Sequence, residues 1–384
     1  MVCLVKMTPL RFCDERRASR LKTIKTTRIF SLPGVLALLV GLLLTACGDP
    51  TATTAPATTA AITTTKATTV AAATTAAIAG PATTAAATGA GVNAAAGPNP
   101  CPDPVPAPAK AAPPEAARSG TEKPATLRIG LIPNQNPESQ KQQYATFKTY
   151  MEKEMAQPIE LFVANDYAGV VQAMVADKID LAYFGGLTYV QAKEQTELYP
   201  IVTEIDRFTN GPTYCSAIVV PADSPIKTVA ELKGKSFAFG DISSTSGSLF
   251  PRIMLEQAGI KVPTDLKEVK YTGGHDATAL AVQNGAVDGG GLEERVMLRL
   301  IDQGKLDKSK VRVIQRIAVT GHPWAVRAKL DPALVDKITN VFVNIKDQDL
   351  LKLLRAEAYV KIKDADYEYV REQGLKFGLL TPKK

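Results

Sequence analysis

The chain has 384 residues, 45% of them hydrophobic and 22% charged, which is enough for two or three folded domains. Its formal net charge is +7, but residues 1–46 contain eight basic and two acidic side chains, so the remainder is almost neutral. This distribution excludes the broad basic surface of a nucleic-acid-binding protein.

The N-terminal segment is typical of an exported lipoprotein. A basic leader precedes an apolar run at residues 35–46, which has the length of the hydrophobic part of a secretory signal and is short for a membrane span. The run ends in Leu-Thr-Ala-Cys at residues 44–47, which resembles the lipobox of bacterial lipoproteins. We predict a signal peptide over residues 1–46 and a lipid on Cys47, which places the protein on the extracytoplasmic face of the cell membrane. An uncleaved N-terminal anchor is the alternative.

Residues 47–120 consist almost wholly of Ala, Thr, Pro and Gly. Such a segment buries too little apolar surface to offset the entropy of ordering, so we predict a disordered tether between the lipid and the folded part. Cys101 lies in this Pro-rich segment, whereas Cys215 lies in an apolar run that resembles a buried strand. An exported protein can form disulfides, but this placement favours two unpaired thiols.

From Thr126 to the C-terminus, β-like apolar runs alternate with helical patterns. The predicted strand-then-helix pairs are residues 159–166 and 167–177, 179–186 and 187–195, 236–241 and 249–258, and 267–274 and 275–285, after a first strand at 126–133. Alternation of this kind predicts mainly parallel sheets flanked by helices. About 260 residues exceed what one such sheet usually needs, so we expect two α/β lobes.

Polar side chains collect where predicted strands end and helices begin. These junctions are residues 132–137, 165–167, 184–189, 243–248 and 273–277. Because ligands of open α/β sheets bind outside the carboxyl ends of the strands, the five junctions predict one cleft.

The richest junction contains Ser243, Ser244, Thr245, Ser246 and Ser248 together with Gly247. One hydroxyl is enough to cap a helix, and a helix start also suits an anion because unpaired N–H groups converge there. We therefore predict an oxyanion site at this stretch, with simple helix capping as the alternative.

Three further residues are candidates for ligand contact. His275 follows two glycines at another predicted helix start, and His322 is the only other histidine. Glu293 follows three glycines and can meet a cation or a hydroxyl, although it and Glu294 also suit the solvated first turn of a helix. The histidines have no acid or cysteine at ligand spacing, so we predict no metal site and no cofactor. The chain also lacks GxSxG, HExxH, GxxxxGK[ST] and SxxK motifs of common enzymes.

Residues 166–190, 229–251 and 273–288, in this order, resemble the phosphate-, phosphite- and phosphonate-binding proteins of ABC importers. The resemblance implies a type II periplasmic-binding fold, in which two α/β lobes are joined by a two-strand hinge. It divides the chain into lobe 1 at residues 126–213 and 323–384 and lobe 2 at residues 214–322. The hinge strands fall near residues 214–221 and 314–323.

The same resemblance implies a set of ligand-binding residues. The oxyanion is expected to contact Ser244, Thr245, Ser246, Gly247, Tyr167, Tyr183 and His275, with Phe184 as the alternative to Tyr183. Two positions depart from the family pattern. Gly185 and Gly186 replace the usual Gly-Pro, and His322 stands where members that take aminoalkyl phosphonates have an acid. The ammonium group of an aminoalkyl phosphonate would therefore have one carboxylate fewer to pair with in this protein. Glu293 remains a candidate partner for it.

The predicted function is that of a lipid-anchored, monomeric solute-binding protein that captures a small phosphorus oxyanion for an ABC permease. It is expected to have no enzymatic activity. Alternatives on the same fold are a binder of a sulfonate or a thiamine-pyrimidine precursor, and a sensor that passes its ligand state to a partner receptor. A cell-surface hydrolase with His275 as general base is the alternative from another class.

Overall fold

The structure is a computed structural model that describes Cys101 and residues 117–381, all of them within one compact unit, Thr88–Lys384. The predicted signal peptide, the predicted lipidation at Cys47 and most of the predicted tether lie outside the described residues. Within the described part, every helix is too short or too polar to cross a membrane.

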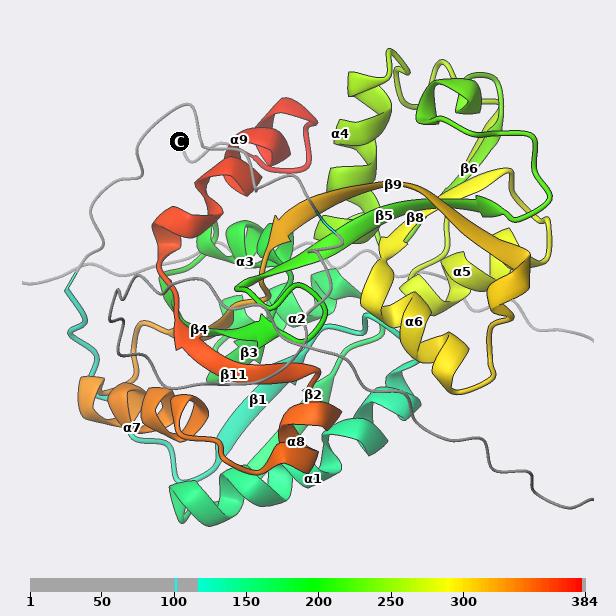
Figure 1. Ribbon diagram of the computed structural model, residues 1–384. Coiled ribbons are helices and arrows are strands. Elements are labelled where there is room, and N and C mark those ends of the chain that lie inside the picture. Colours follow the sequence, from blue (N-terminus) through cyan, green and yellow to red (C-terminus); the bar gives the residue numbers. More distant parts are fainter. Residues whose placement is uncertain (1–100, 102–116, 382–384) are drawn as a thin grey trace, which may run out of the picture. The chain divides into compact units, whose positions relative to one another are not determined.

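Two mixed sheets form the framework (Figure 1). The first has the order β11-β4-β10-β3-β1-β2 and the second the order β7-β6-β8-β5-β9. The strands are β1 Leu127–Leu131, β2 Ile159–Val163, β3 Leu181–Tyr183, β4 Leu198–Asp206, β5 Thr213–Pro221, β6 Ser236–Phe239, β7 Glu268–Tyr271, β8 Gly289–Glu293, β9 Val311–Thr320, β10 Trp324–Arg327 and β11 Ala356–Lys361. The prediction of two α/β lobes is confirmed, and we call the six-stranded sheet with its helices lobe 1 and the five-stranded sheet with its helices lobe 2.

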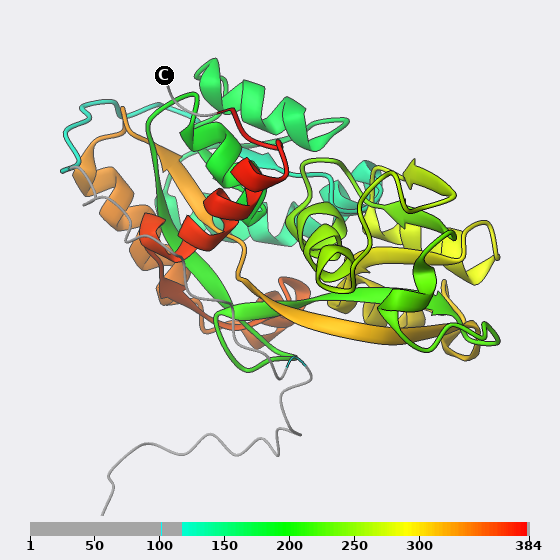
Figure 2. The same ribbon diagram turned by 90° about the horizontal axis from the view of Figure 1, so that it is seen from above.

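The chain passes between the two sheets twice. It leaves β4 for β5 and later leaves β9 for β10, and β5 and β9 pair antiparallel from Thr213 opposite Thr320 to Pro221 opposite Val311. Figures 1 and 2 show these two strands running side by side. After the second passage, β10 inserts between β3 and β4 and pairs antiparallel with both. Lobe 1 is therefore built from the first and last parts of the described chain.

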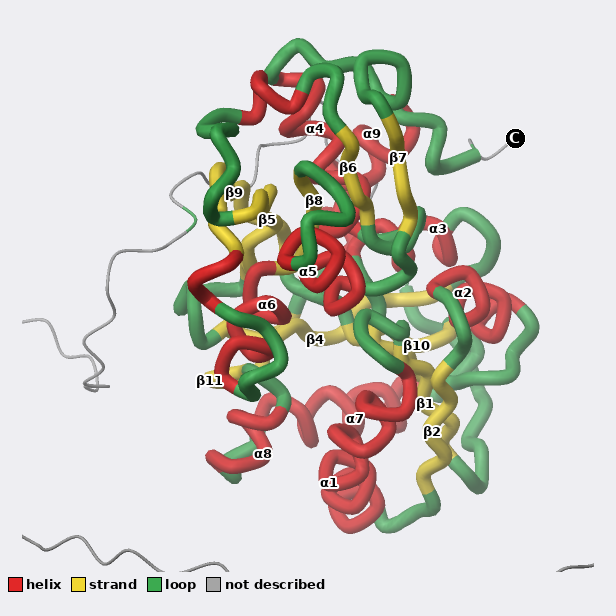
Figure 3. The backbone as a smooth tube through the Cα atoms, turned by 90° about the vertical axis from the view of Figure 1, so that its right-hand side faces the viewer, coloured by secondary structure: helices red, strands yellow, loops and turns green. Residues whose placement is uncertain are grey.

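Nine α-helices occur within the described residues. They are α1 Pro137–Met155, α2 Tyr167–Val175, α3 Gly186–Lys193, α4 Phe250–Gln257, α5 His275–Gln283, α6 Glu294–Asp302, α7 Pro332–Val343, α8 Gln348–Leu353 and α9 Glu368–Lys376. In Figure 3, α1, α7 and α8 gather on one side of the lobe 1 strands, and α2 and α3 lie on the other.

Local sequence explains how the helices start and which face they bury. The side chain of Asn136 accepts hydrogen bonds from two N–H groups of the first turn of α1, and Pro137 lacks the N–H that would be unpaired there. Helix α1 buries Tyr144, Phe147 and Met151, which are spaced three or four residues apart. Tyr144 and Phe147 contact the ring of Trp324 of β10. The core of lobe 1 thus joins an early helix to a late strand.

A disulfide joins Cys101 to Cys215 of β5, with Cα atoms 5.8 Å apart, so the prediction of two unpaired thiols is wrong. The bond is buried beside Ala318 of the paired strand β9. Because the two cysteines are 114 residues apart in sequence, composition alone did not indicate that Cys101 lies beside this strand.

Candidate ligand-binding site

The hydroxyl stretch between β6 and α4 forms a π-helical turn, Thr245–Leu249, ahead of α4. The Ser244 hydroxyl caps this turn by accepting a hydrogen bond from the N–H of Gly247 at 3.0 Å. The Ser248 hydroxyl donates to the carbonyl of Asp241 at 2.7 Å. Thr245 Oγ1 instead accepts from the N–H of Leu187 in α3, at 2.9 Å. Two hydroxyls thus stabilise the turn, whereas that of Thr245 contacts lobe 1.

Two glycines allow groups to approach this turn closely. A Cβ atom at Gly247 would lie 2.9 Å from Cε1 of His275, and one at Gly185 would lie 2.9 Å from Oγ1 of Thr245. Both separations are shorter than carbon side chains tolerate. Because Gly247 has no side chain, the imidazole of His275 can pack against the turn within lobe 2. Because Gly185 has none, the start of α3 in lobe 1 can pack against the same turn.

His275 is the first residue of α5 and is buried. Its Nδ1 accepts a hydrogen bond from the N–H of Glu293 at 3.1 Å, so Nε2 holds the proton of the neutral ring. Burial lowers the pKa of His275 to about 4 in spite of the opposing charge of Glu293. At neutral pH His275 is therefore an uncharged donor through Nε2.

Tyr167, the first residue of α2, belongs to lobe 1, whereas His275 belongs to lobe 2. Its backbone N–H donates to a carboxylate oxygen of Asp241 at 3.3 Å, which links α2 to the loop after β6. Burial raises the pKa of the Tyr167 phenol well above its ordinary value, and a hydrogen bond with Ser244 opposes this only in part. The phenol thus remains a protonated donor beside the hydroxyl turn.

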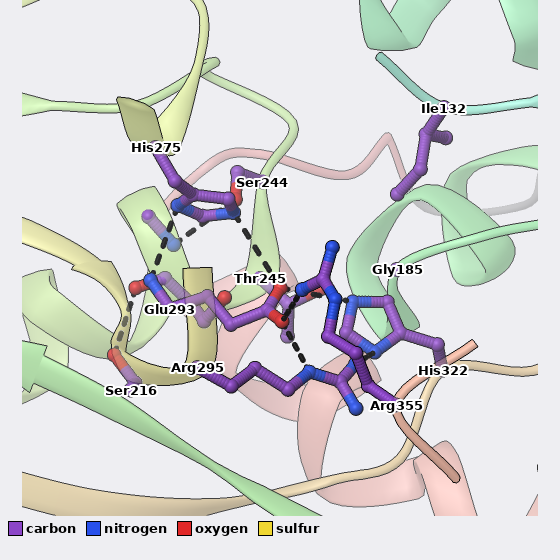
Figure 4. A network of polar contacts seen from close by, with 12 residues as sticks. Ile132, Gly185, Ser216, Ser244, Thr245, His275, Glu293, Arg295, His322 and Arg355 are labelled. Atoms are coloured by element: carbon purple, nitrogen blue, oxygen red, sulfur yellow. Dashed lines mark hydrogen bonds and ion pairs between the residues drawn. The ribbon is translucent and has the colours of Figure 1, made fainter. Parts of the chain in front are cut away.

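A cluster of charges, all buried except for the half-buried Arg355, lies next to these donors (Figure 4). We call it the Arg295 cluster, and it comprises Glu204, Asp206, Glu293, Arg295, His322 and Arg355. The guanidinium of Arg295 contacts Glu293, donates to Asp206 at 2.8 Å and donates to Glu204 at 2.7 Å. Arg355 donates to the same oxygen of Glu293 at 3.3 Å.

Two carboxylates of the Arg295 cluster, Glu204 and Glu293, remain ionised. Burial alone would raise the pKa of Glu204, but the positive charge of Arg295 holds it well below the ordinary value. Burial opposes ionisation of Glu293 as well, and Arg295 and Arg355 together lower its pKa far below the ordinary value. The two arginines thus face three buried carboxylates.

His322 sits inside this cluster with both ring faces covered. Its ring stacks between Tyr183, at a centroid distance of 5.0 Å, and Tyr214, at 4.4 Å. Its Nδ1 lies 2.7 Å from Nη2 of Arg295 and 3.2 Å from Oε1 of Glu204. Because a guanidinium only donates and its contact is the shorter of the two, Nδ1 accepts from Arg295, and Nε2 holds the proton of the neutral ring.

The residues predicted from sequence fall into two adjoining groups. The hydroxyl turn, Tyr167 and His275 form the first group, and the carbonyl of Ser246 is tied to the β5 residue Ser216 at 2.8 Å. Tyr183, His322 and Glu293 form the second, since the Tyr183 hydroxyl lies 3.3 Å from Nη2 of Arg295. Glu293 joins the groups through its backbone bond to His275 and its carboxylate contact with Arg295.

Neither Arg295 nor Arg355 was predicted from the sequence to lie at the site. Arg295 is the third residue of Glu-Glu-Arg at the end of β8, where it resembles an exposed charge on a helix. Glu294, weighed equally with Glu293, turns away from the site and pairs with Arg316 at 2.6 Å. Arg295 and Arg355 also border a groove of about 930 Å³ formed by residues of α1, α5, α6 and α8.

The buried imidazole predicts a pH dependence of stability. The folded-state pKa of His275 lies below its ordinary value of 6.5, so the unfolded chain binds this proton first as the pH falls. We expect the free energy of unfolding to be unaffected by this group above pH about 6.5 and to fall by on the order of 3 kcal/mol toward pH 4. Urea unfolding across this range measures the slope.

His275→Gln serves as the reference for that measurement. Burial raises the pKa of the Asp241 carboxyl, which acts in the opposite direction, so only the difference between the native chain and the variant isolates the imidazole. In His275→Gln the free energy of unfolding is expected to fall less between pH 6.5 and pH 4 than in the native protein. If the free energy of unfolding depends on pH equally in both proteins, the dependence comes from other groups.

Comparison with known proteins matches this chain to one family. Residues 129–367 match the family model described as "ABC transporter, phosphonate, periplasmic substrate-binding protein". The "Phosphate-import protein PhnD" of Mycolicibacterium smegmatis is 30% identical over 271 residues, which cover 65% of this chain and 84% of the relative. The "Probable ABC transporter phosphite binding protein PhnD1" of Prochlorococcus marinus is 26% identical over 268 residues, which cover 66% and 90%.

A solved structure confirms the fold. The structure of PhnD1 from Prochlorococcus marinus in complex with methylphosphonate superimposes with a TM-score of 0.61 at 24% identity, covering 67% of this chain and 99% of that one. Proteins of the matched family are substrate-binding components of transporters and not enzymes, which overturns the hydrolase alternative. The chain belongs to the periplasmic phosphonate-type substrate-binding proteins of ABC transporters.

Proposed function

We propose that this protein captures a small phosphorus oxyanion outside the cytoplasmic membrane and delivers it to an ABC permease. The observation that carries the proposal is the gathering of uncharged donors at one buried place: the hydroxyl turn, the phenol of Tyr167 and Nε2 of His275. Neutral donors at a helix start bind oxyanions without a lysine or arginine. The names of the relatives support phosphate, phosphite or a phosphonate as the ligand.

Ligand exchange requires the lobes to separate. The hydroxyl turn is buried, and the bond from Leu187 to Thr245 and that from His275 N–H to the carbonyl of Asn134 join the lobes around it. We propose that β5 and β9, with the passages at their ends, act as the hinge between lobe 1 (residues 126–213 and 323–384) and lobe 2 (residues 214–322). Closure over the ligand then excludes water and strengthens each hydrogen bond to it.

The remaining parts of the proposal concern attachment. Cys47 is proposed to carry a lipid, with residues 47–100 as a tether that lets a monomeric binding unit reach the permease, because the disulfide to Cys215 fixes Cys101 to the folded unit. This arrangement is supported by the Leu-Thr-Ala-Cys sequence at the end of the apolar run and by the extracytoplasmic location of the family.

Calorimetry with phosphate, phosphite and methylphosphonate tests the function. At least one of the three is expected to bind the purified protein at neutral pH with a dissociation constant on the order of 1 μM or below, equivalent to about 8 kcal/mol or more of binding free energy. Acetate, an oxyanion of a different shape, serves as the control and is expected not to bind. Absence of heat with all three phosphorus oxyanions would refute the proposal.

A further inference from the structure

One oxygen of Glu293 has no hydrogen-bond partner within the described part of the chain. Oε1 contacts both Arg295 and Arg355, whereas Oε2 is buried and unpaired. The whole side chain is 0% exposed. An ionised oxygen buried without a donor is costly, so its persistence at the ligand site calls for a partner.

Two histidine nitrogens lie near Oε2 of Glu293 but beyond hydrogen-bond distance. Nε2 of His322 lies 3.6 Å from Oε2 of Glu293, and Nε2 of His275 lies 3.9 Å from it. Both distances exceed a hydrogen bond. In each neutral ring Nδ1 is an acceptor, from Arg295 in one case and from the Glu293 N–H in the other, so each Nε2 carries its proton toward the same oxygen. Figure 4 shows the two rings converging on the carboxylate.

Two donors and one acceptor around a single point match the bonding capacity of a hydroxyl group. A hydroxyl donates one hydrogen and accepts through two lone pairs, whereas an unprotonated oxyanion oxygen only accepts. We propose that Glu293, His275 and His322 recognise the hydroxyl of a singly protonated tetrahedral oxyanion. The protein then selects phosphorus oxyanions, whose last acidic proton is lost only near or above neutral pH, over sulfate and sulfonates, which are fully deprotonated there. This inference rests on the proposed function and specifies its ligand class.

The position of the three groups suits such a ligand. Cε1 of His275 contacts the hydroxyl turn at Gly247, so a tetrahedral anion held by the turn places another of its oxygens beside Nε2. An unprotonated oxygen there would face the negative Oε2 of Glu293 with no hydrogen between them. In a buried site such repulsion between like charges is weakly screened. Glu293 stays ionised because Arg295 and Arg355 hold its other oxygen.

Calorimetry with inorganic phosphate and potassium sulfate, at one ionic strength and pH 7, tests the inference. The two anions share shape and size and differ in the proton. The native protein is expected to bind phosphate at least a hundredfold more tightly than sulfate. Methylphosphonate and methanesulfonate form a second pair with the same difference. In Glu293→Gln the preference within each pair is expected to shrink at least tenfold, because the amide can donate to an unprotonated oxygen.

Asp180→Asn is the matched control. Asp180 is also fully buried and pairs with two arginines, Arg128 and Arg327, but it lies outside the Arg295 cluster and both of its oxygens have hydrogen-bond partners. The Asp180→Asn variant is expected to keep the ratio of the two affinities within each pair. Should Glu293→Gln fail to fold, the native ratios decide the question alone.

The outcomes separate this inference from the function it rests on. Comparable native affinities within a pair, or a Glu293→Gln variant with an unchanged ratio, would overturn the inference and leave the proposed function in place. No binding of phosphate, phosphite or methylphosphonate by the native protein would overturn both.

Discussion

Replacing Arg295 by methionine is expected to lower the free energy of unfolding by about 3–5 kcal/mol. The substitution keeps a long side chain but removes the positive charge that contacts Glu204, Asp206 and Glu293. All three carboxylates are buried, so the protein would retain negative charges without water to solvate them. Urea unfolding followed by circular dichroism measures the change as a shift of the midpoint.

Arg207→Met provides the control for this experiment. Arg207 pairs with Glu357 through the same kind of contact, but the two side chains are 35% and 41% exposed. Exposed ion pairs contribute about 0–1 kcal/mol, so this variant is expected to unfold almost as the native protein does. Equal destabilisation by the two substitutions would mean that the buried cluster is no more important for stability than a surface pair.

The double substitution Thr245→Ala and Ser246→Ala is expected to weaken binding of the phosphorus oxyanion a hundredfold or more. Each lost charge-assisted hydrogen bond to the anion costs about 1.5–3 kcal/mol, and a hundredfold corresponds to about 2.8 kcal/mol. Loss of the bond between Leu187 and Thr245 also weakens the closed arrangement of the lobes. His275→Ala is expected to act in the same direction on the same ligand. Calorimetric titration with the ligand that binds the native protein measures both effects.

Ser248→Ala separates ligand binding from helix capping. The Ser248 hydroxyl belongs to the same stretch but is already bonded to the carbonyl of Asp241. Its loss is expected to lower stability by about 0.5–1.5 kcal/mol and to leave affinity within a factor of about three. If the double variant melts earlier yet binds with native affinity, the hydroxyl stretch is only a helix start and the site lies elsewhere.

Sequence alone predicted the parts of this protein that depend on short-range patterns. Alternating apolar runs and helical periods indicated the two lobes, and hydroxyls ahead of an amphipathic helix indicated the turn at Thr245–Leu249. Both predictions depend only on residues that are close together in the sequence. The Ser244 cap, for example, is formed with Gly247, three residues away.

The Arg295 cluster was not predictable in the same way, because its members come from five separate parts of the chain: β4, β8, α6, the segment between β9 and β10, and the segment before β11. The contacts of Arg295 with Glu204 and Asp206 and of Arg355 with Glu293 span 62 to 91 residues of sequence. The choice between Glu293 and Glu294 was open for a related reason. One residue ends a strand and the next starts a helix, so their side chains leave the backbone in different directions.

The position of β10 imposes an order on how the molecule can assemble. This strand fills the middle of the six-stranded sheet, between β3 and β4, although it follows every strand of the other sheet along the chain. A chain that emerges from its N-terminus can complete the five-stranded sheet first. Until β10 follows, the edges of β3 and β4 with which it pairs remain unpaired. Such edges are templates for pairing with other chains. Until residue 327 becomes available, β3 and β4 therefore remain open to pairing with other chains.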